Sequence, residues 1–131
     1  MTQENKELLL KDLCVRLPYG VKVHINSPIE EQNSMELFDV NFDSKRIGVN
    51  NEKWAFRAIP IIDDEDEEKV VKPYLRPMSS MTEEERKYLQ KLPFPYDFVD
   101  WLNKHHFDYR GLIEKGLALE APEGMYKLKE K

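Results

Sequence analysis

The stretch at residues 36–43, ELFDVNFD, alternates apolar and polar side chains. Phe38, Val40 and Phe42 take every second position, with acidic and amide side chains between them. A period of two is typical of a β-strand, because successive side chains of a strand point to opposite faces of the sheet. The stretch therefore predicts a strand whose aromatic side is buried and whose polar side faces water.

Three further stretches share this alternation and lie close by along the chain. Polar turns at residues 43–45 and 50–51 separate them, which favours hairpin connections. Short strands at close spacing predict an antiparallel meander, either a small sheet or a partial barrel. The stretches are VKVHIN at residues 21–26, a short strand at 47–49, and residues 54–59.

The segment before these strands has the helical period of 3.6 residues. Within residues 4–16, Leu10, Leu13 and Cys14 recur at positions i, i+3 and i+4, which predicts a helix with an apolar stripe. Pro18 disfavours helical backbone in the residue before it and ends the helix. Cys14 lies on the stripe, so we interpret it as a core residue and not as a nucleophile.

The segment after the strands predicts a stiff connector followed by short helices. Prolines bracket residues 73–77 and favour extended backbone there. Thr82 and Glu85 have the spacing of a capping box, so a short helix should follow. Asp97 is the predicted N-cap of a second helix over residues 97–106.

Together these elements predict an α+β fold in one domain spanning residues 1–131. Its first part, residues 1–72, holds the N-terminal helix and a small antiparallel sheet or partial barrel of four to five strands. Its second part, residues 73–131, holds the proline-rich connector and the short C-terminal helices. The stretch LALEAPEGMY at 117–126 adds a short strand or a clasp back to the sheet, with a turn at residues 123–124.

The net charge of −5 comes from one acidic run at residues 63–68, DDEDEE, outside which the chain is nearly neutral. Consecutive like charges favour a hydrated loop, and a docking patch for a basic partner is the alternative interpretation. Nucleic-acid binders usually carry a basic stripe that neutralises phosphates. The sequence has no such stripe, which disfavours nucleic acid as a partner.

The cysteine content and the N-terminal stretch predict a compartment. Cys14 is the single cysteine, which excludes an intramolecular disulfide and favours reducing conditions. The stretch MTQENKELLLKD has no basic leader and falls short of the roughly 18 apolar residues of a membrane span. We therefore expect a cytoplasmic protein with no membrane segment. The five glycines are scattered, so neither a phosphate-binding loop nor a cofactor is predicted.

Residues 103–109, NKHHFDY, place two adjacent histidines next to an aspartate. His105 continues the apolar stripe of the preceding helix, and His106 is rotated by about 100° towards the edge of that stripe. Adjacent histidines diverge on a helix, whereas zinc-binding helices use positions i and i+4. Asp108 is the predicted N-cap of a further helix at 109–116. The stretch is therefore interpreted as a joint between two helices.

Three stretches of the chain resemble a family of small proteins, of no established activity, encoded by phages, prophages and mobile elements of gut bacteria. They are ELLLKDLCVRLPYGVKV at 7–23, VKPYLRPMSSMTEEE at 71–85 and DWLNKHHFDYRGLIEKGLALEAPEGMY at 100–126. The resemblance implies a host-cytoplasmic setting and an accessory role. It carries over no catalytic or binding residue.

The favoured functional hypothesis is a non-enzymatic module that binds another protein. Such a module would use an exposed sheet edge or an aromatic-lined groove. Tyr74, Leu75 and Arg76 lie between two prolines and are the candidate binding residues, because tyrosine and arginine are common binding anchors. The sequence leaves the oligomeric state open.

Two alternatives use the helical joint. The first is a nucleic-acid-binding protein whose helices at 97–106 and 109–116 act as a helix-turn-helix element. The second is a metal-dependent enzyme in which His105, His106 and Asp108 hold the ion.

Overall fold

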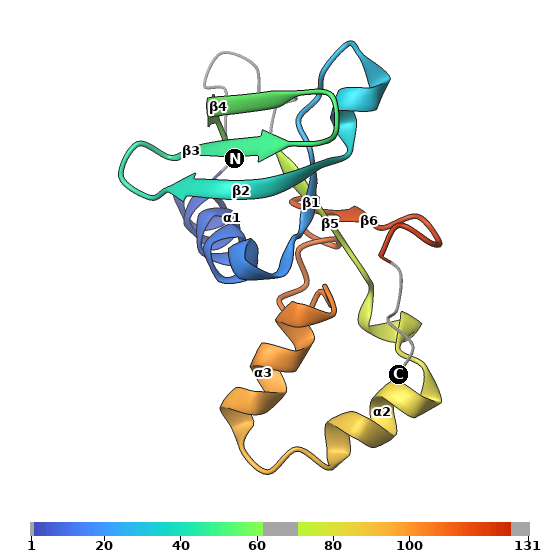
Figure 1. The fold of residues 1–131 in the computed structure, drawn as a ribbon. Coiled ribbons are helices and arrows are strands. Elements are labelled where there is room, and N and C mark those ends of the chain that lie inside the picture. Colours follow the sequence, from blue (N-terminus) through green and yellow to red (C-terminus); the bar gives the residue numbers. More distant parts are fainter. Residues whose placement is uncertain (1, 62–70, 127–131) are drawn as a thin grey trace.

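A six-stranded sheet with the order β4–β3–β2–β1–β5–β6 is the central element of the computed structural model, which describes residues 2–61 and 71–126 (Figure 1). Neighbouring strands are antiparallel, apart from the parallel pair β5–β6. The predicted α+β fold is confirmed, and the sheet is open. The strands are β1 Lys22–His24, β2 Met35–Asn41, β3 Arg46–Asn50, β4 Ala55–Pro60, β5 Lys72–Leu75 and β6 Leu119–Glu120.

Two of these strands come from the later part of the sequence. β5 lies where a connector is predicted, and it pairs with β1 so that Val23 is opposite Pro73. Proline is tolerated in a strand where the ladder does not need its N–H group. β6 confirms the strand predicted near the C-terminal end, and Gly124 (φ +83°) lies in the turn that follows it. The sheet therefore takes strands from both sides of the predicted boundary at residue 72.

Gly48 lies where the register of β3 shifts against both neighbouring strands. A Cβ atom at this position would come within 2.7 Å of the Phe38 ring, which covers the glycine. Phe38 is the extra residue of the bulge in β2, so the alternation of that strand changes face there. Leu37 and Met35 are buried, whereas Phe42 is 59% exposed. The predicted buried side of this strand is therefore wrong for Phe42 and before the bulge, whereas Val40 packs against the main core as predicted.

Helix α1 (Gln3–Arg16) packs its leucines into the main core. Thr2 is its N-cap, and the Thr2 hydroxyl accepts a hydrogen bond from the Asn5 N–H at 3.1 Å. Cys14 is only half-buried, whereas Asp12, which the helical period places off the stripe, is completely buried. The main core contains Leu9, Leu10, Leu13, Val21, Val23, Met35, Leu37, Ile47, Val49, Ile61, Val71, Leu75, Leu112, Leu117 and Ala118.

Helices α2 (Glu83–Gln90) and α3 (Pro95–Lys104) extend away from the sheet (Figure 1). They pack around a second apolar cluster of Leu89, Leu102 and Phe107. The capping box of α2, formed by Thr82 and Glu85, is confirmed. The predicted N-cap role of Asp97 is wrong, because α3 already begins at Pro95, and proline suits the first helical turn.

Three short 3₁₀ helices complete the described elements: η1 Leu17–Tyr19, η2 Glu30–Asn33 and η3 Met78–Ser80. In residues 2–61 and 71–126, no helix combines the length and the apolar character needed to cross a membrane. The acidic run at 63–68 lies outside the described residues.

Candidate functional site

The histidine pair follows the end of α3, and its two rings point to different surroundings. His106 has φ +65° and is 8% exposed, whereas His105 is half-buried. The His105 ring does pack beside that of Trp101, one turn back on the predicted stripe, but it is only half-buried, and the prediction that His106 lies at the edge of the stripe is wrong. The reason is that α3 ends at Lys104, so the helical rotation of about 100° per residue no longer applies. The left-handed backbone of His106 turns its ring inward.

The backbone after His106 joins the end of β5. The Arg76 N–H donates to the His106 carbonyl at 2.7 Å, and the Asp108 N–H donates to the Arg76 carbonyl at 2.8 Å. These bonds form a parallel bridge between Arg76 and Phe107. The joint is therefore held by an isolated bridge to the residue directly after β5, which the sequence pattern does not indicate.

Asp108 caps the segment that follows it, but that segment is not a helix. Its carboxylate accepts hydrogen bonds from the N–H groups of Leu112 (2.8 Å) and Ile113 (2.9 Å). Residues 109–116 form turns, and Gly111 and Gly116 both have positive φ angles in which a helix cannot continue. The predicted helix at 109–116 is wrong, and with it the second helix of a helix-turn-helix element.

The three candidate metal ligands do not converge. The centroid of the His105 ring lies 4.3 Å from that of Trp101, and the centroid of the His106 ring lies 3.7 Å from that of Tyr126. Both carboxylate oxygens of Asp108 are occupied by backbone N–H groups. Across the part of the chain that the structure describes, no three or more His, Cys, Asp or Glu side chains are grouped so that they could hold a metal ion.

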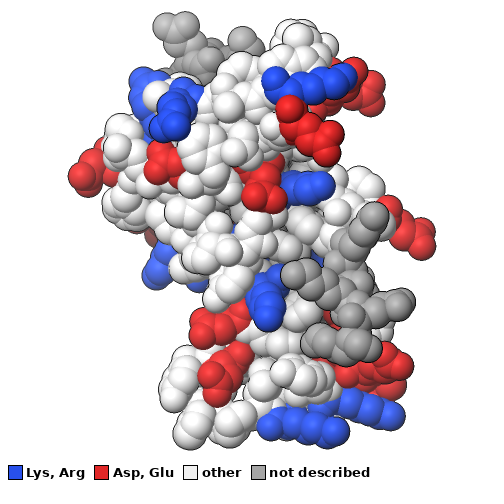
Figure 2. Space-filling view, viewed as in Figure 1, with Lys and Arg blue, Asp and Glu red and all other residues white. Residues whose placement is uncertain are grey.

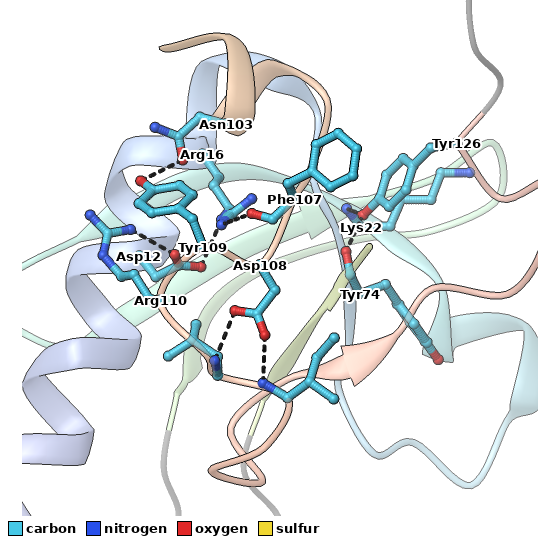
Figure 3. Close-up of polar contacts among 12 residues, drawn as sticks. Asp12, Arg16, Lys22, Tyr74, Asn103, Phe107, Asp108, Tyr109, Arg110 and Tyr126 are labelled. Carbon is cyan, nitrogen blue, oxygen red and sulfur yellow. Dashed lines mark hydrogen bonds and ion pairs between the residues drawn. The ribbon is translucent and has the colours of Figure 1, made fainter. Parts of the chain in front are cut away.

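A buried charge network links α1 to the segment after the joint (Figure 3). Asp12 accepts from Arg16 Nε and from Arg110 Nη1, both at 2.8 Å. Arg16 Nη2 also donates to the Phe107 carbonyl at 2.6 Å. Asp12 and Arg16 are completely buried, so this one carboxylate serves two guanidinium groups away from water. The i, i+4 spacing of Asp12 and Arg16 is the signal in the sequence that could have indicated the pair.

The candidate binding residues at 74–76 are engaged inside the molecule. Leu75 is 0% exposed and belongs to the main core, so it presents no surface. The Tyr74 hydroxyl donates to the Asn33 carbonyl at 2.9 Å. Arg76 stacks over the Phe107 ring at 4.1 Å and makes two hydrogen bonds to Glu85, at 2.7 and 2.9 Å. Substituting these residues would therefore destabilise the fold, so a loss of binding in such variants would not identify a binding surface.

Tyr126 holds the C-terminal end of the described chain against the sheet. Its hydroxyl accepts from the Lys22 N–H at 2.8 Å and donates to the Tyr74 carbonyl at 2.7 Å (Figure 3). These two groups lie one position beyond the last pair of the β1–β5 ladder, so the hydroxyl bridges the strands where direct pairing ends. Burial raises the pKa of the Tyr126 hydroxyl above its usual value, which keeps it protonated as a donor.

The imidazole of His106 is held in its neutral form. Burial lowers its pKa to about 4, and the positive charges of Arg16, His105 and Arg76 act in the same direction. Among the described residues, His106 Nδ1 and Arg16 Nη1 are buried and have no hydrogen-bond partner. Burial likewise raises the pKa of the Cys14 thiol and so disfavours the thiolate that nucleophilic chemistry needs.

Exposed apolar side chains gather on α2, α3 and the connection between them. We call this region the aromatic arm, and its exposed members are Tyr88, Phe94, Tyr96, Phe98 and Val99. The rings of Phe94 and Tyr96 stack on each other with centroids 5.5 Å apart, and both remain more than half exposed. Figure 2 shows uncharged surface at the lower left, over the connection between α2 and α3, with acidic side chains above it and basic side chains beside it.

Comparisons of the chain with protein-family models, with curated proteins and with solved structures found no match.

Proposed function

We propose that this chain is a non-enzymatic protein-interaction module that binds its partner through the aromatic arm. The single observation that carries the proposal is the exposure of the five large apolar side chains on that arm. Contiguous exposed apolar surface is uncommon on proteins that act alone and is typical of interaction sites. Tyrosine and other aromatic residues are also enriched among the residues that dominate binding energies.

The pattern of burial along α3 supports this choice. Leu102 is buried in the second cluster, whereas Phe98, four residues earlier on the same side of the helix, is 40% exposed. Val99, three residues before Leu102, is equally exposed. The apolar stripe of α3 therefore continues beyond the part that the described residues cover. A partner with a complementary apolar surface would gain about 25 cal/mol for each Å² of that stripe removed from water.

The two alternatives have less structural support. Asp108 and the two histidine rings are each engaged separately, which disfavours a metal-dependent enzyme. The nucleic-acid alternative needs a second helix where residues 109–116 form turns. It also needs free cations, whereas Arg110 is paired with Asp12.

We extend the proposal to the setting of the protein. The resemblance of residues 7–23, 71–85 and 100–126 supports an accessory role for a phage, prophage or mobile element. The single half-buried cysteine supports a cytoplasmic location, where thiols stay reduced.

A photo-crosslinking amino acid at position 96 tests the proposed surface. Tyr96 is 65% exposed, and Phe42 on the sheet, at 59%, is a matched control because it is also an exposed aromatic residue. In the native cell, the proposal predicts a discrete adduct from position 96 and none of the same size from position 42. Adding Phe98→Ser should remove the adduct, and far-UV circular dichroism checks that the variant remains folded. Equal adducts from both positions, or none from position 96, would refute the aromatic arm as the binding surface.

A further inference from the structure

A groove with a volume of about 470 Å³ lies between residues 76–82, which lead into α2, and residues 120–126. This volume lies within the range of about 300–1,000 Å³ that is usual for ligand sites. One wall comes from the end of β5, from η3 and from the cap of α2, and the other wall comes from β6 and the turn after it. The lining residues are Arg76, Pro77, Ser80, Thr82, Glu120, Ala121, Pro122, Glu123, Gly124 and Tyr126.

The groove opens between the residues that follow β5 and those that follow β6, and Glu120 is its one lining residue from β6 among the described residues. β6 pairs with β5 so that Glu120 is opposite Leu75, and the Ala121 N–H donates to the Leu75 carbonyl at 2.8 Å. In a parallel ladder, a residue bonds to the two neighbours of the residue opposite it. The N–H and C=O groups of Glu120 therefore point away from β5. They lie on the outer edge of β6, outside the groove, so recognition inside the groove falls to side chains.

The charge left in the groove is negative. Arg76 is neutralised by its two hydrogen bonds to Glu85, and both side chains are less than 15% exposed. Glu120 and Glu123 are exposed, and neither forms an ion pair with another described residue. Two uncompensated carboxylates in one groove favour a cationic ligand.

The walls are held in place before any ligand arrives. Tyr126 is fixed by its bonds to Lys22 and Tyr74, and the Ser80 hydroxyl donates to the Pro77 carbonyl at 2.7 Å. Thr82 is fixed by the capping box. A preformed site loses less conformational entropy on binding, which suits a short peptide.

We propose that this groove binds a short extended peptide segment rich in lysine or arginine. The peptide lies between the two walls of the groove, and its cationic side chains meet the carboxylates of Glu120 and Glu123. Pro77, Pro122 and the Tyr126 ring contact the aliphatic parts of the peptide side chains. The site lies apart from the aromatic arm, so it adds a second recognition surface to the proposed function, and each can fail without the other.

Fluorescence anisotropy with the labelled hexapeptide Lys-Val-Lys-Val-Lys-Val tests the proposal on the full chain. We expect saturable binding that weakens with salt, and no binding of the matched Glu-Val-Glu-Val-Glu-Val peptide. The double variant Glu120→Gln/Glu123→Gln should bind about fivefold more weakly, as two surface charge contacts imply. The matched control Glu83→Gln/Glu114→Gln removes two exposed carboxylates outside the groove and should leave the affinity unchanged.

Residues 127–131 follow Tyr126 directly and carry three lysines. The titration is therefore repeated with the variant Lys127→Ser/Lys129→Ser/Lys131→Ser, so that internal competition is not mistaken for the absence of a site. Failure of the Lys-Val peptide to bind in either background would overturn the proposal. The proposal would also be overturned if the Lys-Val peptide bound Glu120→Gln/Glu123→Gln and Glu83→Gln/Glu114→Gln with equal affinity. Equal affinity of the protein for the Lys-Val and Glu-Val peptides would overturn it as well.

Discussion

The ring of Tyr126 stacks on the imidazole of His106 with centroids 3.7 Å apart and planes inclined by 18°. The stack joins the C-terminal end of the described chain to the corner after α3. It also shields the imidazole from water, so that two groups with strongly shifted pKa values, one lowered and one raised, lie face to face.

Removing the hydroxyl of Tyr126 should destabilise the protein. In Tyr126→Phe, the Lys22 N–H and the Tyr74 carbonyl lose their shared partner at a part-buried position. We expect a loss of about 1–3 kcal/mol in the free energy of unfolding, measured by urea titration. Tyr96→Phe removes an exposed hydroxyl and is the matched control, with an expected change below about 0.5 kcal/mol. Equal effects of the two substitutions would contradict the bridging role.

Neutralising Asp12 should have a larger effect. Asp12→Asn removes the charge that balances the completely buried Arg16 and also holds Arg110. Breaking a buried ion pair on one side typically costs about 3–5 kcal/mol, because the remaining charge is left without compensation. Asp39→Asn, on an exposed part of β2, is the control and should be nearly neutral. Thermal unfolding of both variants by circular dichroism measures the difference.

Lowering the pH should destabilise the protein through His106. Its pKa is about 4 in the folded protein against an ordinary value of 6.5, so the unfolded chain binds more protons between these values. Stability should therefore be fully present above pH 6.5 and should fall as the pH decreases towards 4, by at most about 1.4 kcal/mol per pH unit. Urea titrations across this range give the slope.

The variant His106→Asn isolates this contribution, because asparagine tolerates the left-handed backbone of position 106. We expect a flatter dependence of stability on pH in this variant. Burial, and secondarily the charge of Lys72, also lowers the pKa of His24. The variant His24→Asn therefore measures the contribution of His24 to the pH dependence separately from that of His106. An unchanged slope in His106→Asn would show that the buried imidazole does not titrate as expected.

A methyl group at position 48 should disturb the bulge. In Gly48→Ala, the new Cβ would lie 2.7 Å from Phe38 Cζ and 3.2 Å from Asp39 Cβ, so the ring must move. We expect a loss of about 1–3 kcal/mol in the free energy of unfolding. In Phe38→Ala/Gly48→Ala the ring is absent, so the loss should be smaller than the sum of the two single effects. Additive effects would show that ring and glycine are not coupled.

Local sequence patterns predicted where helices and strands occur better than they predicted which face of each element is buried. Thr82 and Glu85 specify the capping box through neighbouring backbone atoms, so their spacing was sufficient to predict it. The buried face of β2 was predicted only in part, because the bulge at Phe38 depends on the pairing of β2 with β3. β5 was missed because Pro73 disfavours a strand unless its partner needs no N–H there.

The joint at residues 103–109 was also predicted only in part, because some of its contacts come from distant parts of the sequence. Asp108 acts on residues four and five positions later, so its capping role is local and was predictable. The inward turn of His106 depends on where α3 ends and on the bond from Arg76, thirty positions earlier in the sequence. The exposed face of the aromatic arm could not be predicted, because the same apolar pattern is expected for a helix whose stripe is covered.

The bond from Arg16 to the Phe107 carbonyl spans 91 positions of the chain. During synthesis, α1 leaves the ribosome long before this acceptor and Arg110 exist. Until then, the guanidinium of Arg16 and the carboxylate of Asp12 must stay hydrated, which opposes docking of α1 onto the early strands. The nascent first half should therefore remain loosely structured, and completion of the fold should wait for the last fifth of the polypeptide.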